Sequence, residues 1–128
     1  MIDTSKLTIE KAHEHLTNGD FSAQELAEKY LENIKKRNKD LNVYLEVYDD
    51  ALLQAERADA MFKSGQATQM TGIPIAIKDN ILFSGHKASA GSKILENHIA
   101  TYDSTVVKKL KDAGAVIIGR TNMDEFAM

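Results

Sequence analysis

The feature of the sequence that most constrains the fold is a short apolar run, Ile75–Ile77, which is preceded by Pro74 and ends at Lys78. An apolar run without a polar break is typical of a strand that is buried on both faces, in a sheet covered by helices. Pro74, the only proline of the chain, cannot donate a hydrogen bond to a neighbouring strand. We therefore expect a strand that begins at Pro74 and is covered on both faces.

Lys78 directly follows this apolar run, so its amine is expected at the carboxyl end of the predicted strand. Ligands of open α/β sheets bind at the carboxyl ends of the strands. Burial disfavours the ammonium form, so a lysine in such a place can be neutral at about pH 7 and act as a base. The structural alternative is that Lys78 extends to solvent or pairs with Asp79 or Asp103. The residues alone leave both interpretations open.

A second and stronger strand signal, Ala115–Ile118, follows a predicted helix. We expect Asp103 to cap this helix and Gly114 to end it. Three of its apolar residues are expected to face the core: Val106, Val107 and Leu110. A strand, a crossover helix and a second strand form a βαβ unit with parallel strands. The polar residues that follow the two strands, Lys78–Asn80 and Arg120–Asn122, are therefore expected to lie side by side.

The first half of the chain predicts three helices with clear start and stop signals. They run from a cap at Thr8 to about Asn18, from a capping box at Ser22–Glu25 to about Asn38, and from a cap at Asp49 or Asp50 to about Ser64. Between the second and third helices, Leu41–Tyr48 alternates apolar and polar residues. This alternation fits either a short half-exposed strand or an extended segment that lies on another surface.

A polar loop over residues 65–71 is the one plausible boundary in the chain. It divides a helical arm, residues 1–65, from residues 66–128, the first part of an α/β domain. The predicted class is therefore α/β, with amino-terminal helices followed by a βαβ unit. Because two strands do not make a stable sheet, this unit is expected to be the start of a larger mixed sheet flanked by helices.

Composition excludes several classes of function. The net charge is −3 and the pI about 5.8, so no strongly basic field exists to hold DNA. The chain has no cysteine, and its four histidines lack the spacing of metal ligands. The amino terminus has no apolar core typical of a signal peptide, and no apolar run is long enough to span a membrane. A cytoplasmic protein without a bound metal is expected.

Four stretches closely resemble one known family: Gly72–Asn80, Ser92–Asn97, Tyr102–Leu110 and Gly114–Met128. The family is that of the amidase signature enzymes. Gly72–Asn80 is similar to a block found across its amidases. The ending Asn122–Met128 resembles a narrower branch, the A subunits of the tRNA-dependent amidotransferases. Residues before Gly72 match this branch in layout, as helices that lead to the first core strand.

The resemblance implies a Ser-cisSer-Lys triad in which Lys78 is the base. The lysine deprotonates a bridging serine, which relays to the serine nucleophile that attacks the side-chain amide of glutamine. Backbone donors stabilise the oxyanion. The resemblance also implies partner subunits of B and C type, one of which receives the ammonia, uses ATP and Mg and binds the mischarged tRNA. This chain itself is expected to bind no cofactor.

The sequence departs from the family because the glycine- and serine-rich stretch with both catalytic serines lies beyond the position of Met128. The serines present, Ser89, Ser92 and Ser104, are outside that motif, and we expect loop or cap roles for them. The chain is therefore expected to be the front part of a larger domain and to be inactive alone.

Three hypotheses on function follow. The first is the amino-terminal part of a glutamine-hydrolysing amidotransferase subunit, and the ending Asn122–Met128 favours it. The second is part of a stand-alone amidase that acts on small amides. The third is a non-catalytic module that only binds a partner subunit.

Overall fold

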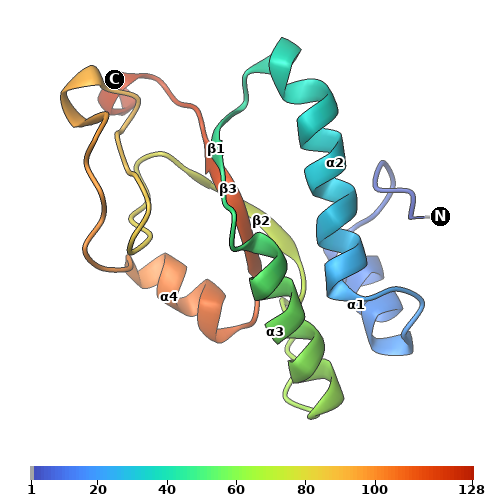
Figure 1. Ribbon diagram of the computed structural model, residues 1–128. Helices are drawn as coiled ribbons and strands as arrows, with labels where there is room; N and C mark the ends of the chain where they lie inside the picture. Colours follow the sequence, from blue (N-terminus) through green and yellow to red (C-terminus); the bar gives the residue numbers. More distant parts are fainter. Residues whose placement is uncertain (1) are drawn as a thin grey trace.

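A sheet of three strands lies between helices on its two sides (Figure 1). The computed structural model describes residues 2–128. Its elements, in chain order, are α1 (Ile9–Asn18), α2 (Ala23–Leu41), β1 (Tyr44–Val47), α3 (Ala51–Lys63), β2 (Pro74–Lys78), the 3₁₀ turn η1 (Lys93–Leu95), α4 (Thr105–Asp112), β3 (Val116–Thr121) and the 3₁₀ turn η2 (Glu125–Ala127). This arrangement confirms the predicted class, in which amino-terminal helices precede a βαβ unit.

The strand order is β1-β3-β2, so β3 is central. Strands β2 and β3 pair in parallel, as the βαβ prediction requires, whereas β1 pairs antiparallel to β3. Of the two alternatives for Leu41–Tyr48, the half-exposed strand is confirmed. Since β1 belongs to residues 1–65 and pairs with a strand from residues 66–128, the two ranges share one sheet. The proposed boundary between a helical arm and an α/β part stays a prediction.

The helices of the first half begin where the sequence predicts. The hydroxyl of Thr8 accepts the first cap hydrogen bond of α1, and Ser22 and Glu25 form the predicted capping box of α2. Helix α2 ends three residues later than predicted, at Leu41, where Asn42 adopts a left-handed conformation with φ of 50°. Among residues 2–128, no helix is both long and apolar enough to cross a membrane.

Two predictions for α4 are wrong. The helix is capped by Ser104, whose hydroxyl accepts from the Val107 amide at 3.3 Å, and not by Asp103. The carboxylate of Asp103 instead accepts from the Ser84 amide and from Lys111. Val106 does not face the core, because its side chain is exposed, whereas Val107 is fully buried.

Two apolar clusters, one on each side of β3, make up the core. The first joins α1, α2 and α3 to Val116 and Ile118. The second joins Val107 of α4 and the loop residue Phe83 to Ile117. Alternate residues of β3 thus point into opposite clusters, and the strand is buried on both faces, as predicted for the run Ala115–Ile118.

The prediction that β2 is covered on both faces is wrong for residues 2–128. Ala76 is exposed, because β2 lies at the edge of the sheet. The pairing of β2 with β3 also shifts register between Ile75 and Ala76. This irregularity turns Ile75 toward the first cluster and Ile77 toward the second, although side chains two apart normally share a face.

The side chain of Gln54 on α3 completes the hydrogen bonding of β3 beyond the end of β1. Its amide nitrogen donates to the carbonyl of Ile117 at 3.1 Å, and its oxygen accepts from the Ile117 amide at 2.9 Å. The Tyr48 amide, which follows β1, bonds to the next carbonyl of β3, that of Ile118. Helix α3 is therefore joined to the sheet by a polar as well as an apolar contact.

Gly119 lies where β1 and β3 approach most closely. A methyl group at Gly119 would collide with the carbonyl oxygen of Glu46 and lie 3.0 Å from the Tyr44 ring. We predict that Gly119→Ala lowers the free energy of unfolding by about 3 kcal/mol, because backbone atoms cannot move aside cheaply. Urea unfolding followed by circular dichroism measures this loss.

Gly65→Ala is the matched control for this substitution. Its added methyl group meets nothing within 4 Å, but its φ of 71° is left-handed, so a loss of about 1 kcal/mol is expected. A Gly119→Ala variant as stable as the control would contradict the close packing of β1 on β3.

Candidate active site

The carboxyl ends of the two parallel strands lie side by side, as predicted. Lys78, the last residue of β2, is paired with Thr121, the last residue of β3. The hydroxyl of Thr121 donates to the carbonyl of Ile77 at 3.2 Å, and the Asp79 amide donates to the carbonyl of Thr121 at 3.1 Å. The backbone on both sides of Lys78 is therefore bound to β3.

The side chain of Lys78 is exposed to solvent at this edge of the sheet. The alternative in which it pairs with a nearby acid is not observed, because Asp79 pairs with Arg120 and Asp103 pairs with Lys111. Lys78 is thus placed where a base could reach a ligand, and its role stays a prediction.

Directly after Lys78, the carboxylate of Asp79 is fully buried and accepts hydrogen bonds from three other residues. Oδ1 accepts from the Ser89 amide at 3.0 Å and from Nη1 of Arg120. Oδ2 accepts from the Ser89 hydroxyl at 2.6 Å and from the Gly91 amide at 2.8 Å. We call Asp79, Ser89, Gly91, Arg120 and Glu46 the Asp79 network, since Arg120 also donates from Nε to Glu46 at 2.9 Å.

Contacts within this network stabilise the charges of Asp79 and Arg120, whose side chains are buried. Burial by itself raises the pKa of Asp79, but the hydrogen bonds from Ser89, Gly91 and Arg120 outweigh it and hold the pKa below its usual value. Burial also lowers the pKa of Arg120, but Glu46 and Asp79 raise it further, so the guanidinium keeps its charge. The pair is a buried salt bridge in which both oxygens of Asp79 accept hydrogen bonds and Arg120 donates from Nε and Nη1.

The loop that carries Ser89 and Gly91 also packs against the segment after β3. Gly91 has φ of 64°, and a methyl group there would lie 2.8 Å from the carbonyl oxygen of Met123. The Phe126 amide donates to the carbonyl of Ala90 at 2.8 Å. The Ser92 hydroxyl donates to Glu125 at 2.7 Å. The strand ends, this loop and the segment 122–127 thus form one contiguous surface.

The three serines named above have structural partners. Ser89 binds Asp79 and is buried, Ser92 binds Glu125 and caps η1, and Ser104 caps α4. These contacts fit the loop and cap roles expected for them. For Ser89 the acceptor is a carboxylate whose pKa is held below its usual value, so Asp79 is a weak base for the proton of this hydroxyl.

Sequence reasoning did not anticipate the Asp79 network. The polar residues at the two strand ends were the available signal, and they pointed to Lys78 rather than to an ion pair between Asp79 and Arg120. Nothing in the sequence marks Glu46, which lies 74 positions before Arg120.

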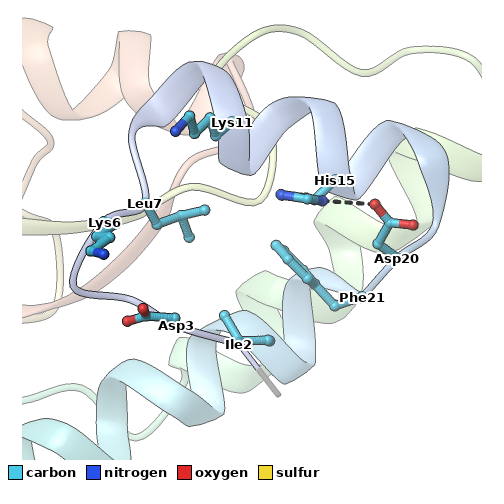
Figure 2. A pocket seen from close by; sticks show the side chains of 8 residues that line it. All are labelled: Ile2, Asp3, Lys6, Leu7, Lys11, His15, Asp20 and Phe21. Atoms are coloured by element: carbon cyan, nitrogen blue, oxygen red, sulfur yellow. Dashed lines mark hydrogen bonds and ion pairs between the residues drawn. The ribbon is translucent and has the colours of Figure 1, made fainter.

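A cavity of about 420 Å³ beside α1 is a separate feature (Figure 2). It is lined by Ile2, Asp3, Lys6, Leu7, Lys11, His15, Asp20 and Phe21. Nδ1 of His15 lies 2.7 Å from Oδ2 of Asp20 at its rim, within hydrogen-bond distance, and both side chains are about half exposed. Leu16 of α1 lies against Gly72, ahead of β2. Helix α1 is therefore near the start of β2, at the opposite end of this strand from Lys78.

The Asp79 network predicts a specific dependence of stability on pH. Because the pKa of Asp79 is lower in the folded chain than in the unfolded one, its contribution is complete above about pH 4 and is lost as the pH falls through the folded value. We predict that Asp79→Asn loses about 3 kcal/mol at neutral pH, since Arg120 stays buried without its partner. Its stability should also fall less steeply than that of the parent in acid.

Urea unfolding between about pH 7 and pH 3 measures both effects. Asp103→Asn is the control, because the pair of Asp103 with Lys111 is partly exposed and a loss of about 1 kcal/mol or less is expected. An acid dependence that is unchanged by Asp79→Asn would contradict the assignment.

Curated relatives match the chain over most or all of its length. A protein of Nitrosococcus oceani, named as the A subunit of glutamyl-tRNA(Gln) amidotransferase, is 51% identical over 110 residues, which cover 85% of this chain and 23% of the relative. A protein of the same name from Acinetobacter baumannii is 47% identical over the whole of this chain and 26% of its own length. The chain thus spans about a quarter of the length of the curated relatives it matches.

Solved structures of amidases share the fold. The native peptide amidase of Stenotrophomonas maltophilia matches with a TM-score of 0.90 and 30% identity, over 95% of this chain and 26% of that one. A bacterial aryl acylamidase of the amidase signature enzymes matches with a TM-score of 0.86 over 94% of this chain and 26% of that one, but its 21% identity shows the fold alone. The sequence model of the Amidase family matches residues 25–128. With its motifs, its fold and this match in agreement, the chain belongs to the amidase signature family.

Proposed function

We propose that this chain is the amino-terminal part of a glutamine-hydrolysing amidotransferase subunit. The whole protein supplies ammonia for converting Glu-tRNA(Gln) to Gln-tRNA(Gln), Asp-tRNA(Asn) to Asn-tRNA(Asn), or both. The observation that carries this proposal is the 47–51% identity to proteins named as the A subunit of glutamyl-tRNA(Gln) amidotransferase. Identity to the solved peptide amidase is lower, at 30%.

In this proposal Lys78 is the catalytic base. Its amine accepts the proton of a bridging serine, which takes the proton of the nucleophilic serine as that oxygen attacks the side-chain carbonyl carbon of glutamine. The amide C–N bond then breaks, the leaving nitrogen receives a proton to become ammonia, and water later releases glutamate from the serine. The position of Lys78 at the end of β2 supports this role, since its amine is free of ion pairs with Asp79 and Asp103.

The two serines of the triad are proposed to come from the glycine- and serine-rich stretch of the family. Ser89, Ser92 and Ser104 are poor candidates, because each hydroxyl has a structural partner.

The partners and cofactors of the proposed enzyme act through other chains. Ammonia passes to a partner subunit that uses ATP and Mg to activate the mischarged tRNA, in a cytoplasmic complex with subunits of B and C type. The net charge of −3 favours this division, since a chain without a basic field is better suited to pass on ammonia than to hold tRNA by itself.

A stand-alone amidase is the second candidate, favoured by the similarity in structure to a peptide amidase. The two functions differ in substrate. An amidotransferase subunit with its partners releases ammonia from glutamine, whereas a stand-alone amidase hydrolyses peptide or aryl amides without partners. A full-length polypeptide that is active on neither class of amide would support the third alternative, a module that only binds a partner subunit.

Our first prediction for this function concerns Lys78. In the full-length polypeptide with its partner subunits, Lys78→Ala should lower the rate of ammonia release from glutamine by about 10²–10⁴-fold, the usual contribution of a general base. A coupled ammonia assay measures it. Lys93→Ala is the control, since Lys93 is exposed on the surface and its loss should leave the rate unchanged. Near-normal turnover by Lys78→Ala would exclude Lys78 as the base.

Our second prediction concerns the 128 residues alone. This stretch holds the proposed base, Lys78. The hydroxyls of Ser89, Ser92 and Ser104 are hydrogen-bonded to structural partners. The purified chain should therefore release no ammonia from glutamine. The same assay at high protein concentration tests this. Ammonia release that Lys78→Ala abolishes would show that a serine of this stretch is the nucleophile after all.

A further inference from the structure

We propose that Asp79 and Arg120 are positioning residues for Lys78. They set the place of its backbone, and hence the reach of its amine, through the buried Asp79 network. This inference rests on the proposed function, in which Lys78 is the base. Neither residue is proposed to touch the substrate.

Lys78 and Asp79 are consecutive residues with opposite exposure. Lys78 ends β2 and is exposed, whereas the carboxylate of Asp79 is fully buried. Burial alternates along this stretch, since Ile77 and Asp79 are buried whereas Ala76 and Lys78 are exposed. The buried side chain of Asp79 therefore anchors the backbone at the point where the side chain of Lys78 extends to the surface.

Both backbone polar groups and both carboxylate oxygens of Asp79 form hydrogen bonds. Its amide donates to the carbonyl of Thr121, and its own carbonyl accepts from the Ala90 amide, both at 3.1 Å. Its carboxylate accepts from Ser89, Gly91 and Arg120. The residue after Lys78 is thus bound to β3 on one side and to the loop 89–91 on the other.

Arg120 links the end of the sheet at Asp79 to β1. Its guanidinium lies between two carboxylates, with Nη1 on Asp79 and Nε on Glu46 of β1, and its side chain is only 8% exposed. Nη1 also lies 3.4 Å from the Ser89 hydroxyl. The planar guanidinium has a fixed geometry of donors, so these contacts determine the distance between β1 and the end of β2.

The position of the Lys78 backbone should affect the rate of ammonia release. The lysine side chain has a flexible stem, so the attachment point of the stem is the part that the protein can fix. A displacement of about 1 Å in a reacting group can cost about 10²-fold in rate. Loss of the Asp79 carboxylate removes the contacts that tie the residue after Lys78 to Arg120 and to the loop 89–91, which predicts a loss in turnover without a loss in substrate binding.

The experiment is a double-mutant cycle in the full-length polypeptide with its partner subunits. Asp79→Asn alone should lower kcat for ammonia release by about 10–10²-fold, with KM changed less than about threefold. In a Lys78→Ala background, Asp79→Asn should lower the residual rate by less than about twofold, because the residue acts through Lys78. Rates are measured below the melting temperature of every variant.

Three further variants keep the test decisive if Asp79→Asn does not fold. Ser89→Ala removes one donor to Asp79 and should lower kcat about threefold to tenfold. Arg120→Lys keeps the charge and should retain more activity than Arg120→Ala. Asp103→Asn, which breaks the ion pair with Lys111 away from the network, should leave kcat unchanged. Hydrogen exchange of the peptide 86–95 should increase in the Asp79→Asn, Ser89→Ala and Arg120→Ala variants and stay unchanged in Asp103→Asn.

The outcomes separate this inference from the proposed function. If Lys78→Ala keeps its activity, the proposed base is wrong. If Lys78→Ala loses activity but Asp79→Asn keeps its kcat, the base is right and the positioning role is overturned. Equal loss from Asp79→Asn in the parent and in the Lys78→Ala background also overturns it, since that pattern indicates a general structural effect.

Discussion

The buried ion pair between Asp79 and Arg120 is the interaction on which the candidate site depends. A carboxylate removed from water is costly unless donors replace its hydration. Here Ser89, Gly91 and Arg120 supply those donors from segments that are far apart in the chain. Satisfying one buried charge therefore brings together the end of β2, a loop and the end of β3, and the exposed side chain of Lys78 lies on the surface that results.

Local signals in the sequence were enough to predict most of the fold. Thr8 and the capping box at Ser22–Glu25 start their helices as predicted, because a cap satisfies donors within three residues of itself. The prediction that Asp103 caps α4 was wrong. Both Asp103 and Ser104 can cap a helix, but the carboxylate of Asp103 already accepts hydrogen bonds from Lys111 and from the Ser84 amide.

The site could be predicted only in part. The parallel strands placed Lys78 beside Thr121, as expected for a βαβ unit. The register shift beside Ala76 and the partner of Arg120 on β1 were not predictable. The run Ile75–Ile77 is apolar at every position, so a change of register leaves no trace in its pattern. An ion pair across 74 positions depends on strand order, which no short pattern encodes.

The contact of Gln54 with Ile117 has a consequence for insertions and deletions. The side chain of Gln54 takes the place of a strand residue beside β3. Its two hydrogen bonds to Ile117 therefore fix the position of the first turn of α3 relative to β3. A residue added or removed between Val47 and Gln54 would rotate the amide away and leave both backbone groups of Ile117 unpaired. Length variation should therefore be tolerated after Lys63, at the exposed residues 64 and 65, and selected against before Gln54.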